Sequence, residues 1–307
     1  MILHIMTNYT CNYDCEYCYL GDLKSDPQIL NLAKLKQQLA EIARHNIIDT
    51  INLYGGEITL LPLSYIMELY NICRTYASVS IVTNYSNKVY NDYFKTQGID
   101  LSTSINEERD CNALTEFRLL INEYKSLSLI QVVTPSLLKK PPREILRHLS
   151  LFNLNVGFLQ YSPAVHARVN YAITNKEYSS FLKAIVIEYN SGKYNFLINN
   201  IIEIEEVIYN MYNPSMDSVL FINPYNQYCC IHYDKGLEYF QSFDSLEDWA
   251  RECNREAQEY EELCRTCEFY GHCYAEHIKP WRDDDECCGM KSLIRWYRNE
   301  KGVHQNN

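Results

Sequence analysis

Three cysteines near the N-terminus have the spacing of an iron–sulfur ligand loop. Cys11, Cys15 and Cys18 form a C-x3-C-x2-C triplet within eight residues. Three thiolates on one loop can ligate three irons of a cubane [4Fe-4S] cluster, which leaves the fourth iron open to an exogenous ligand. A structural zinc site commonly uses four protein ligands in two short pairs, and no fourth Cys or His follows this triplet closely. The spacing therefore favours an iron–sulfur cluster over zinc.

A second cysteine group lies near the C-terminus. Cys264, Cys267 and Cys273 form a C-x2-C-x5-C run, and Cys287 and Cys288 follow it. This group is suited to a second metal centre. C-x2-C followed by further cysteines is a pattern of zinc sites as well as of iron–sulfur clusters, so both readings stay open at this point.

The remaining cysteines belong to predicted helices and strands. Cys73, Cys111 and Cys253 fall in helical stretches, where we expect inert buried thiols. Cys229 and Cys230 fall in a predicted strand. We expect them to serve packing, and the alternatives are remnants of a lost cluster site or substrate-facing thiols that relay a radical or donate a proton.

Strands and helices alternate through most of the chain and determine where the candidate residues lie. We expect strands at residues 2–6, 50–54, 79–82, 101–105, 129–133 and 156–160. We expect helices at residues 27–45, 62–76, 89–97, 114–125, 142–149 and 175–189, the last with a capping box at Thr174 and Glu177. Six such repeats favour parallel strands joined by right-handed crossovers, so we predict an α/β fold with a partial (β/α)6 TIM-type barrel.

Polar and glycine residues follow these strands at the ends where α/β folds place their sites. The cysteine triplet follows the first strand, and Gly55-Gly56-Glu57 follows the second. Asn84 follows the third, and Ser104 lies near the end of the fourth. Alone, the glycines indicate a turn, and Asn84 and Ser104 are typical of residues that cap strand-end backbone. Their gathering at one end of the predicted barrel favours a site there.

The chain changes character after about residue 195. A helical stretch at residues 196–212 precedes two strands at 218–222 and 227–232, which predict a β-hairpin. A charged helix at residues 245–262, with a start signal at Ser245 and Asp248, leads to the second cysteine group, and a helical tail follows residue 291. We therefore expect a first domain at residues 1–195 and a small cysteine-rich domain at residues 196–307.

Composition limits the location and the partners of the protein. The 307 residues include 13 cysteines, and no signal peptide or membrane-spanning apolar run is present. Many cysteines without secretion indicate metal ligation rather than disulfides, so we expect a soluble cytoplasmic protein that does not bind membranes. A formal net charge of -11 disfavours a broad phosphate-binding surface, so we expect no nucleic-acid partner.

The triplet with Tyr17 just before its third cysteine, together with Gly55-Gly56-Glu57 one strand–helix unit later, resembles the radical S-adenosylmethionine (radical SAM) superfamily. The cysteine-rich C-terminal part resembles the SPASM or twitch extension of that superfamily. The resemblance covers nearly the whole chain. It implies an enzyme whose cluster reductively cleaves S-adenosylmethionine to a 5′-deoxyadenosyl radical, with an external electron donor such as flavodoxin or ferredoxin.

The resemblance also implies roles for individual residues. Cys11, Cys15 and Cys18 ligate the radical SAM [4Fe-4S] cluster. Tyr17 packs near the adenine, Glu57 accepts from the ligand's ammonium, and Ser104 bonds to the ribose. Asn84 belongs to the family's Thr-Asn-Gly strand ending, in which Tyr85 here replaces the glycine. The cofactor-binding positions implied are Tyr17, Gly55, Gly56, Glu57, Asn84 and Ser104.

The C-terminal part departs from the full extension, which binds two auxiliary clusters. His277 stands at the fourth position of the cysteine run, and no cysteine lies between Cys111 and Cys229. Both absences concern the same family cluster, so we expect one auxiliary [4Fe-4S] cluster. Its expected ligands are Cys264, Cys267, Cys273 and Cys287, with Cys288 as the alternative last ligand and zinc as the alternative metal.

The reaction class is better supported than the substrate. Relatives of this type mostly crosslink, epimerise or oxidise ribosomal peptides or proteins, and we expect a peptide substrate. Sulfatase maturases place an aspartate after the hairpin cysteine, whereas Ile231 follows Cys230 here. The first strand begins at Ile2, so either a separate leader-recognition protein or a substrate bound without one is expected. The alternatives are a radical SAM dehydrogenase or related enzyme acting on a small molecule, and a non-catalytic iron–sulfur or zinc protein.

Overall fold

The structure is a computed structural model that describes residues 1–15, 17–105, 127–161, 163–169, 171–192, 194–209, 219–234, 237–264, 267–269 and 291–301. The chain forms two compact units. The first contains Met1–Leu129, Pro163–Asn170 and Asp217–Arg255, and the second contains Ile130–Ser162, Tyr171–Met216 and Glu256–Asn307. The units alternate along the chain, and the predicted division into residues 1–195 and 196–307 stays a proposal.

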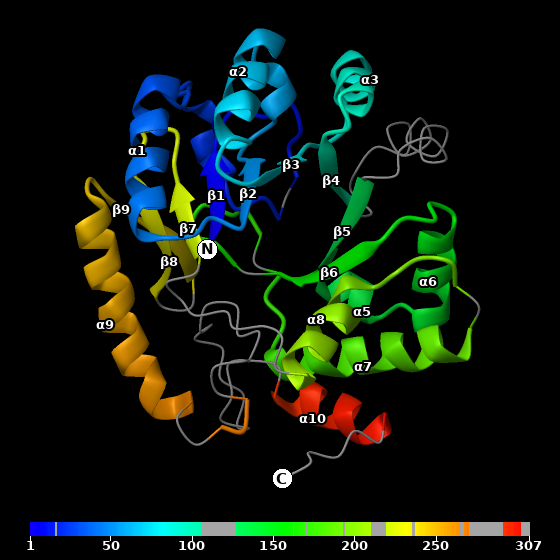
Figure 1. Ribbon diagram of the computed structural model, residues 1–307. Coiled ribbons are helices and arrows are strands. Elements are labelled where there is room, and N and C mark those ends of the chain that lie inside the picture. The colour runs from blue at the N-terminus through cyan, green and yellow to red at the C-terminus, as the bar shows by residue number, and fades with distance from the viewer. Residues whose placement is uncertain are drawn as a thin grey trace. The chain divides into compact units, whose positions relative to one another are not determined.

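A parallel sheet forms the centre of the first unit (Figure 1). Its strands β1 (Ile2–Met6), β2 (Thr50–Tyr54), β3 (Ser78–Val82) and β4 (Asp100–Ile105) pair in sequence order, with His4 opposite Asn52 in the register of β1 and β2. The parallel strand–helix alternation predicted from the sequence is thus confirmed in this unit. The carboxyl ends of the four strands lie along one edge, where the candidate residues follow them.

The predicted hairpin joins the same sheet. Strand β7 (Val219–Ile222) pairs in parallel with β1, and β8 (Tyr228–Asp234) pairs antiparallel with β7 (Figure 1). A further antiparallel strand, β9 (Leu237–Phe243), which was not predicted, pairs with β8 over its whole length. The predicted hairpin is therefore part of a three-stranded antiparallel meander.

Helices of the first unit cover the sheet and bury its alternate side chains. Helices α1 (Leu32–His45), α2 (Leu63–Cys73) and α3 (Lys88–Thr96) follow the strands, with short 3-10 turns at η1 (Gly21–Ser25) and η2 (Ile58–Leu60). Helix α1 begins later than predicted because the Asn31 side chain accepts from the Lys34 N–H and caps it there. Leu3, Ile5 and Leu39 are fully buried.

The second unit contains the rest of the strand–helix alternation. Strand β5 (Leu127–Val133) starts in the first unit and ends in the second, where α5 (Pro135–Leu138), α6 (Pro142–Ser150), β6 (Val156–Gln160), α7 (Asn175–Ser191) and α8 (Asn199–Ile208) follow. The capping box at Thr174 and Glu177 is confirmed at the start of α7. The helix predicted at residues 114–125 lies outside the described residues.

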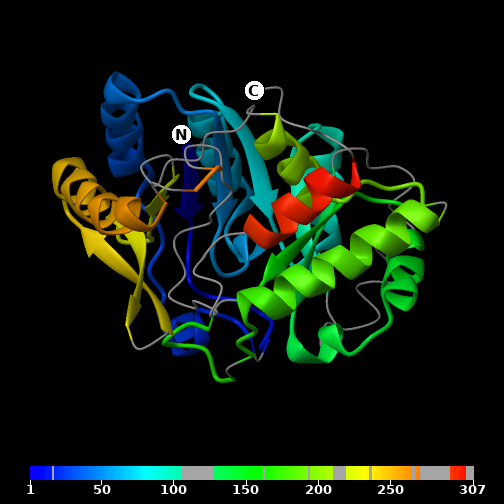
Figure 2. The same ribbon diagram turned by 90° about the horizontal axis from the view of Figure 1, so that it is seen from below.

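The two C-terminal helices agree with the predicted charged helix at residues 245–262 and the predicted helical tail after residue 291. Helix α9 (Leu246–Cys264) begins after Ser245, whose hydroxyl accepts from the Asp248 N–H. Helix α10 (Lys291–Glu300) packs against α7 and α8, and Figure 2 shows it lying along α7. The Tyr297 hydroxyl of α10 donates to Glu205 of α8. Within the described part of the chain, no helix is both long and apolar enough to cross a membrane.

Candidate radical SAM site

The cysteine triplet lies on the loop that leaves β1. Cys11, Cys15 and Cys18 are free and partly exposed. The Cys18 N–H donates to the Cys15 carbonyl (3.1 Å), and the Tyr13 N–H donates to the Cys11 Sγ (3.4 Å). Burial raises the pKa of the Cys11 thiol. N–H bonds to ligand sulfurs are among the levers that tune iron–sulfur clusters, so this loop suits such a ligand role.

A buried polar segment holds the start of this loop. Asn8 is fully buried, accepts from the Thr7 hydroxyl (2.7 Å) and donates to the Thr10 carbonyl (2.9 Å). The Asn8 carbonyl in turn accepts from the Gly56 N–H (2.7 Å). These contacts were not predicted from the sequence, although a Thr-Asn pair directly after a buried strand is a usable signal, because buried polar side chains need partners.

Gly55 and Gly56 fit closely against the same segment. Gly55 has φ of +135°, and a Cβ on it would lie 2.5 Å from the Asn8 carbonyl oxygen. A Cβ on Gly56 would lie 2.0 Å from the Thr10 carbonyl oxygen. Both glycines are therefore required for the packing of the β2 end against the backbone that enters the cysteine loop. Their predicted contact with a cofactor stays a prediction.

Glu57 is buried and links the ends of β2 and β3 by hydrogen bonds. Its side chain is 1% exposed. One carboxylate oxygen accepts from the Thr59 N–H and hydroxyl and from the Thr83 hydroxyl (2.6 Å), and the other accepts from the Asn84 N–H (2.6 Å). The carboxylate thus has donors from the protein itself, and its predicted bond to a ligand ammonium stays a prediction.

Asn84 connects the end of β3 to the cysteine loop. Its side-chain amide donates to Asn12 Oδ1 (2.7 Å) and lies 3.9 Å from the Cys11 Sγ. The next residue, Tyr85, has φ of 63°, in the left-handed region that favours glycine. This conformation explains why a glycine is expected there. The structure therefore brings Cys11, Glu57 and Asn84 into one hydrogen-bonded group.

The other two predicted cofactor residues, Tyr17 and Ser104, lie on the cysteine loop and at the end of β4. Tyr17 is partly exposed and precedes Cys18 in the loop. Ser104 is half-buried near the carboxyl end of β4, and it alternates with the buried Leu101, Thr103 and Ile105. Their placement at the loop and at a strand end agrees with the predicted arrangement, and their contacts with a cofactor stay predictions.

Two tyrosines beside the site have buried side chains that lie close together. Tyr19 follows Cys18, Tyr54 ends β2, and their ring centroids are 6.4 Å apart. The Tyr19 hydroxyl interacts with that of Tyr54, and burial raises the pKa of both phenols well above its ordinary value.

The segment 163–169 is fastened to the cysteine loop and to β9. Asp14 accepts from Arg168 (2.5 Å) and from Lys24 (3.3 Å), which together lower the pKa of its exposed carboxyl. Gly21 has φ of +43°, and a Cβ on it would lie 1.6 Å from the His166 carbonyl oxygen. The turn that follows Cys18 therefore packs closely against the backbone of His166.

Three cysteine thiols on one loop suit an iron–sulfur cluster. Among the described residues, no group of three His, Cys, Asp or Glu side chains is placed to hold a metal ion. Three free thiols on one loop, one of them already accepting an N–H bond, agree with the cluster predicted from the spacing.

The expected auxiliary ligands are only partly described. Cys264 is the last residue of α9, and Cys267 is a free, partly exposed cysteine. Cys273 and Cys287, together with the alternative ligand Cys288, lie outside the described residues. The auxiliary [4Fe-4S] cluster therefore stays a prediction.

The cysteines expected to be inert are buried where they are described. Cys73 in α2 is fully buried, and burial raises the pKa of its thiol to about 12. Cys253 in α9 is 4% exposed, and Cys111 lies outside the described residues. A thiol with so high a pKa is almost wholly protonated at neutral pH and is a poor nucleophile.

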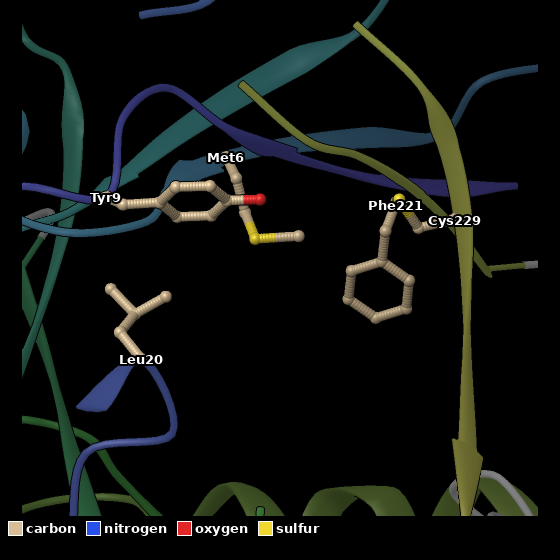
Figure 3. Close-up of a cluster of buried hydrophobic side chains, with 5 residues drawn as sticks. All are labelled: Met6, Tyr9, Leu20, Phe221 and Cys229. Carbon is tan, nitrogen blue, oxygen red and sulfur yellow. The ribbon is translucent and has the colours of Figure 1, made fainter. Parts of the chain in front are cut away.

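Cys229 and Cys230 point to opposite faces of β8. Cys229 packs in an apolar cluster with Met6, Tyr9, Leu20 and Phe221 (Figure 3), and burial raises the pKa of its thiol to about 11. The Cys230 Sγ lies 3.2 Å from His232 Nε2, also in a buried position. Of the alternatives considered from the sequence, these contacts support packing.

Comparison with known proteins supports this site. Residues 5–105 match the family model of the radical SAM superfamily. No curated protein matches. Among solved structures, native anSMEcpe with bound AdoMet has a TM-score of 0.69 at 16% identity, covering 98% of this chain and 97% of that one. The same protein with bound AdoMet and Cp18Cys peptide has a TM-score of 0.68 at 17% identity, covering 98% and 97%.

A second solved structure has the same fold. Streptococcus suis SuiB bound to S-adenosylmethionine has a TM-score of 0.64 at 13% identity, covering 90% of this chain and 72% of that chain. At these identities the likeness establishes the fold. This chain therefore carries a radical SAM domain, with its matched residues 5–105 holding the cysteine loop and the β2, β3 and β4 ends, in an α/β fold similar to those of anSMEcpe and SuiB.

Proposed function

We propose that this protein is a radical SAM enzyme that modifies a ribosomal peptide or protein. The observation that carries the proposal is the hydrogen-bonded group at the cysteine loop. Glu57 and Asn84, which follow β2 and β3, hold the loop that presents Cys11, and the superfamily match covers these residues. S-adenosylmethionine and a [4Fe-4S] cluster on Cys11, Cys15 and Cys18 are the cofactors of this proposal.

The bound cofactors supply reductive cleavage to a 5′-deoxyadenosyl radical, and the protein binds and positions them. Cys11, Cys15 and Cys18 hold the cluster. Asn8 and Glu57 fix the entry of the loop and the adjoining strand ends, so that the thiols keep their spacing.

A peptide is the substrate class we propose. The similar structures include anSMEcpe with bound Cp18Cys peptide, and SuiB bound to the precursor peptide SuiA. The fold of this chain is therefore one on which peptide substrates are bound. The proposal extends to an external electron donor, a separate leader-recognition protein, one auxiliary [4Fe-4S] cluster on Cys264, Cys267, Cys273 and Cys287, and a cytoplasmic location.

Cofactor cleavage is tested by removing one thiol of the triplet. After anaerobic reconstitution and reduction, we expect the wild-type protein to form 5′-deoxyadenosine from S-adenosylmethionine and Cys15→Ala to form none, because one iron loses its ligand. Chromatography of the nucleoside measures both. The matched control is Cys73→Ala, which removes a buried thiol far from the loop in sequence and should retain formation. Equal formation by Cys15→Ala would contradict the proposal.

The substrate class is tested by isotope transfer. Peptides encoded beside the gene are prepared with deuterated side chains and incubated with the reconstituted protein. Transfer of deuterium into 5′-deoxyadenosine, measured by mass spectrometry, is the expected result because the radical abstracts hydrogen from its substrate. Nucleoside formation without transfer from any such peptide would instead favour the small-molecule alternative.

A further inference from the structure

The outer edge of β9 presents backbone groups that β8 does not use. In the β7–β8 turn, the Asn223 N–H donates to the Gln227 carbonyl, so odd-numbered residues of β8 bond towards β7 and even-numbered residues towards β9. Gln241 faces Cys230 in the continuous register of β8 and β9, and it therefore bonds inward. Its neighbours Phe240 and Ser242 direct their N–H and C=O groups outward.

Contacts at Glu238 confirm this assignment independently. The Glu238 N–H donates to the Pro163 carbonyl (2.7 Å), and its carbonyl accepts from the Val165 N–H (2.9 Å). Ala164 thus forms a parallel bridge with Glu238. Alternate residues of a strand direct their N–H and C=O groups to the same side. The backbone groups of Glu238, Phe240 and Ser242 therefore all point away from β8. The edge of β9 already accepts an extended segment at one position.

The segment leaves this edge directly after Val165. The Ala167 N–H donates to the Ala164 carbonyl and turns the chain away, and His166 packs against Gly21 instead. Among the described residues, no backbone hydrogen bond reaches the outward groups of Phe240 and Ser242. Ser242 is exposed. The outward backbone groups of Phe240 and Ser242 are therefore available to pair with another strand.

A cavity lies at the open part of the edge. It has a volume of about 650 Å³ and is lined by β9 residues that include Phe240 and Ser242, by Val165 and His166, and by Tyr9 and Tyr19 near the cysteine loop. Met6 and Tyr9 belong to the apolar cluster of Figure 3, which forms part of its wall. The cavity thus joins the free edge to the segment that follows the three thiols.

The lining has a chemical preference. Asp26 and Glu238 contribute carboxylates, and among the described lining residues there is no Lys or Arg. Several aromatic rings, including the neighbouring rings of Tyr19 and Phe240, also line the cavity. Carboxylates beside aromatic rings favour cations, and the whole chain has a formal net charge of -11.

We infer that the open edge of β9 binds an extended, cationic segment of the peptide substrate as an added strand, with side chains of that segment in the adjoining cavity. The peptide pairs with the outward N–H and C=O groups of Phe240 and Ser242, on the same edge of β9 where Pro163–Val165 bonds to Glu238. This is β-strand addition, in which main-chain bonds give affinity and pockets for alternate side chains give specificity. The inference rests on the proposed function for its substrate class.

Binding is tested on the full-length wild-type protein with fluorescein-labelled probes. The probe is acetyl-Lys-Val-Lys-Val-Lys-amide, and its matched control is acetyl-Glu-Val-Glu-Val-Glu-amide. Fluorescence anisotropy is expected to show binding of the basic probe at least about tenfold tighter than the acidic one, with weakening as salt increases. Equal binding of the two, or binding of neither, would overturn the inference.

Strand pairing is tested on the probe's backbone. Two further basic probes carry N-methyl groups either on the Val residues or on the Lys residues. Alternate residues of an added strand bond to β9, so one methylated probe should lose at least about fivefold in affinity while the other keeps its binding. If both methylated probes bind as tightly as the parent, the segment does not bind as a strand.

Two substitutions at one residue test the edge itself. Ser242→Pro removes the outward N–H, and an edge strand tolerates proline where that N–H faces solvent. Ser242→Ala keeps the N–H and removes only the hydroxyl that bonds to Asn223. We expect Ser242→Pro to bind the basic probe at least about fivefold more weakly than Ser242→Ala. Equal affinities of two folded variants would overturn the inference.

Folding of both variants is checked by thermal melting and by hydrogen exchange of the inward amides of Tyr239 and Gln241. The methylated probes on the wild-type protein decide the matter if Ser242→Pro does not fold. Failure of the inference is also distinguishable from failure of the proposed function. Edge binding without 5′-deoxyadenosine formation contradicts only the function, whereas nucleoside formation without edge binding overturns only the inference.

Discussion

At the scale of single residues, the site depends on close backbone contacts more than on side chains that face a ligand. Gly55 and Gly56 allow the end of β2 to approach the carbonyls of Asn8 and Thr10. Glu57 then bonds to donors from the next strand end. These contacts explain why small and acidic residues stand at these positions before any cofactor is considered.

Gly56→Ala should disturb the cysteine loop. Its Cβ would lie 2.0 Å from the Thr10 carbonyl oxygen, so the backbone has to shift, at a cost of about 1–3 kcal/mol. Urea unfolding should show this loss, and reconstitution should yield less bound iron. The control is Gly157→Ala in β6, where the nearest atom to an added Cβ is 3.7 Å away. Equal effects of the two substitutions would show that the contact is unimportant.

Glu57→Gln should destabilise the protein without any cofactor present. An amide NH2 in place of one carboxylate oxygen would face donors of Thr59, Thr83 or Asn84, which leaves a buried group unsatisfied and costs about 1–3 kcal/mol. Chemical unfolding of the cofactor-free protein measures the loss. Glu68→Gln on the exposed face of α2 is the matched control and should change stability little. An unchanged free energy of unfolding in Glu57→Gln would show that these hydrogen bonds do not stabilise the strand ends.

At the scale of elements, β8 connects two different environments. Its Cys229 face packs in the apolar cluster, whereas its Cys230 face carries His232 close to Glu252 of α9 (3.6 Å). Figure 2 shows α9 lying beside β8 and β9. The strand thus joins the apolar cluster near the cysteine loop to a polar contact with α9.

The ion pair of Glu252 with Arg255 should make the free energy of unfolding depend on pH in the acid range. Hydrogen bonds from Arg255 lower the pKa of the Glu252 carboxyl below its ordinary value of 4.5. A group with a lowered folded pKa stabilises above its unfolded pKa and loses that contribution as the pH falls through the folded value. Glu252→Gln should therefore be less stable than wild type at neutral pH, by about 0.5–1 kcal/mol for this partly exposed pair.

The difference between Glu252→Gln and wild type should shrink as the pH falls below about 4.5. Urea unfolding from pH 7 to pH 3.5 measures it. Glu247→Gln removes a neighbouring carboxylate whose side chain is 86% exposed and which pairs with Arg251, and it should show a smaller dependence on pH. A constant difference across this range would refute the role of Arg255.

At the scale of the whole molecule, the chain has two separate groups of cysteines. The N-terminal triplet is described in full, and the C-terminal group is described only at Cys264 and Cys267. Each group lies in a different compact unit, the first in Met1–Leu129 and the second in Glu256–Asn307. Two clusters that are bound independently are therefore the expected arrangement.

Iron analysis of the reconstituted protein should reflect this arrangement. We expect about eight iron atoms per chain in the wild type, and about four in either Cys15→Ala or Cys267→Ala, because each substitution removes one [4Fe-4S] cluster. Cys73→Ala should retain the wild-type content. Zinc in place of the lost iron, or an unchanged iron content in Cys267→Ala, would contradict the auxiliary cluster.

Much of the fold could be predicted because its signals are local. The bounds of β1, β2 and β6 agree with the predicted strands, and the capping box of α7 was visible in Thr174 and Glu177. Strand β9 was not predicted, because its residues Leu237–Phe243 do not alternate between apolar and polar side chains.

The sequence by itself predicted the cluster-binding loop, because the spacing of Cys11, Cys15 and Cys18 is a property of one short loop. Only the tertiary structure decided what surrounds it. The pairing of β7 with β1, the burial of Glu57 between strand ends, and the open edge at Phe240 and Ser242 all join residues far apart in the chain. Such contacts depend on strand order and register, and no local pattern of residues specifies either.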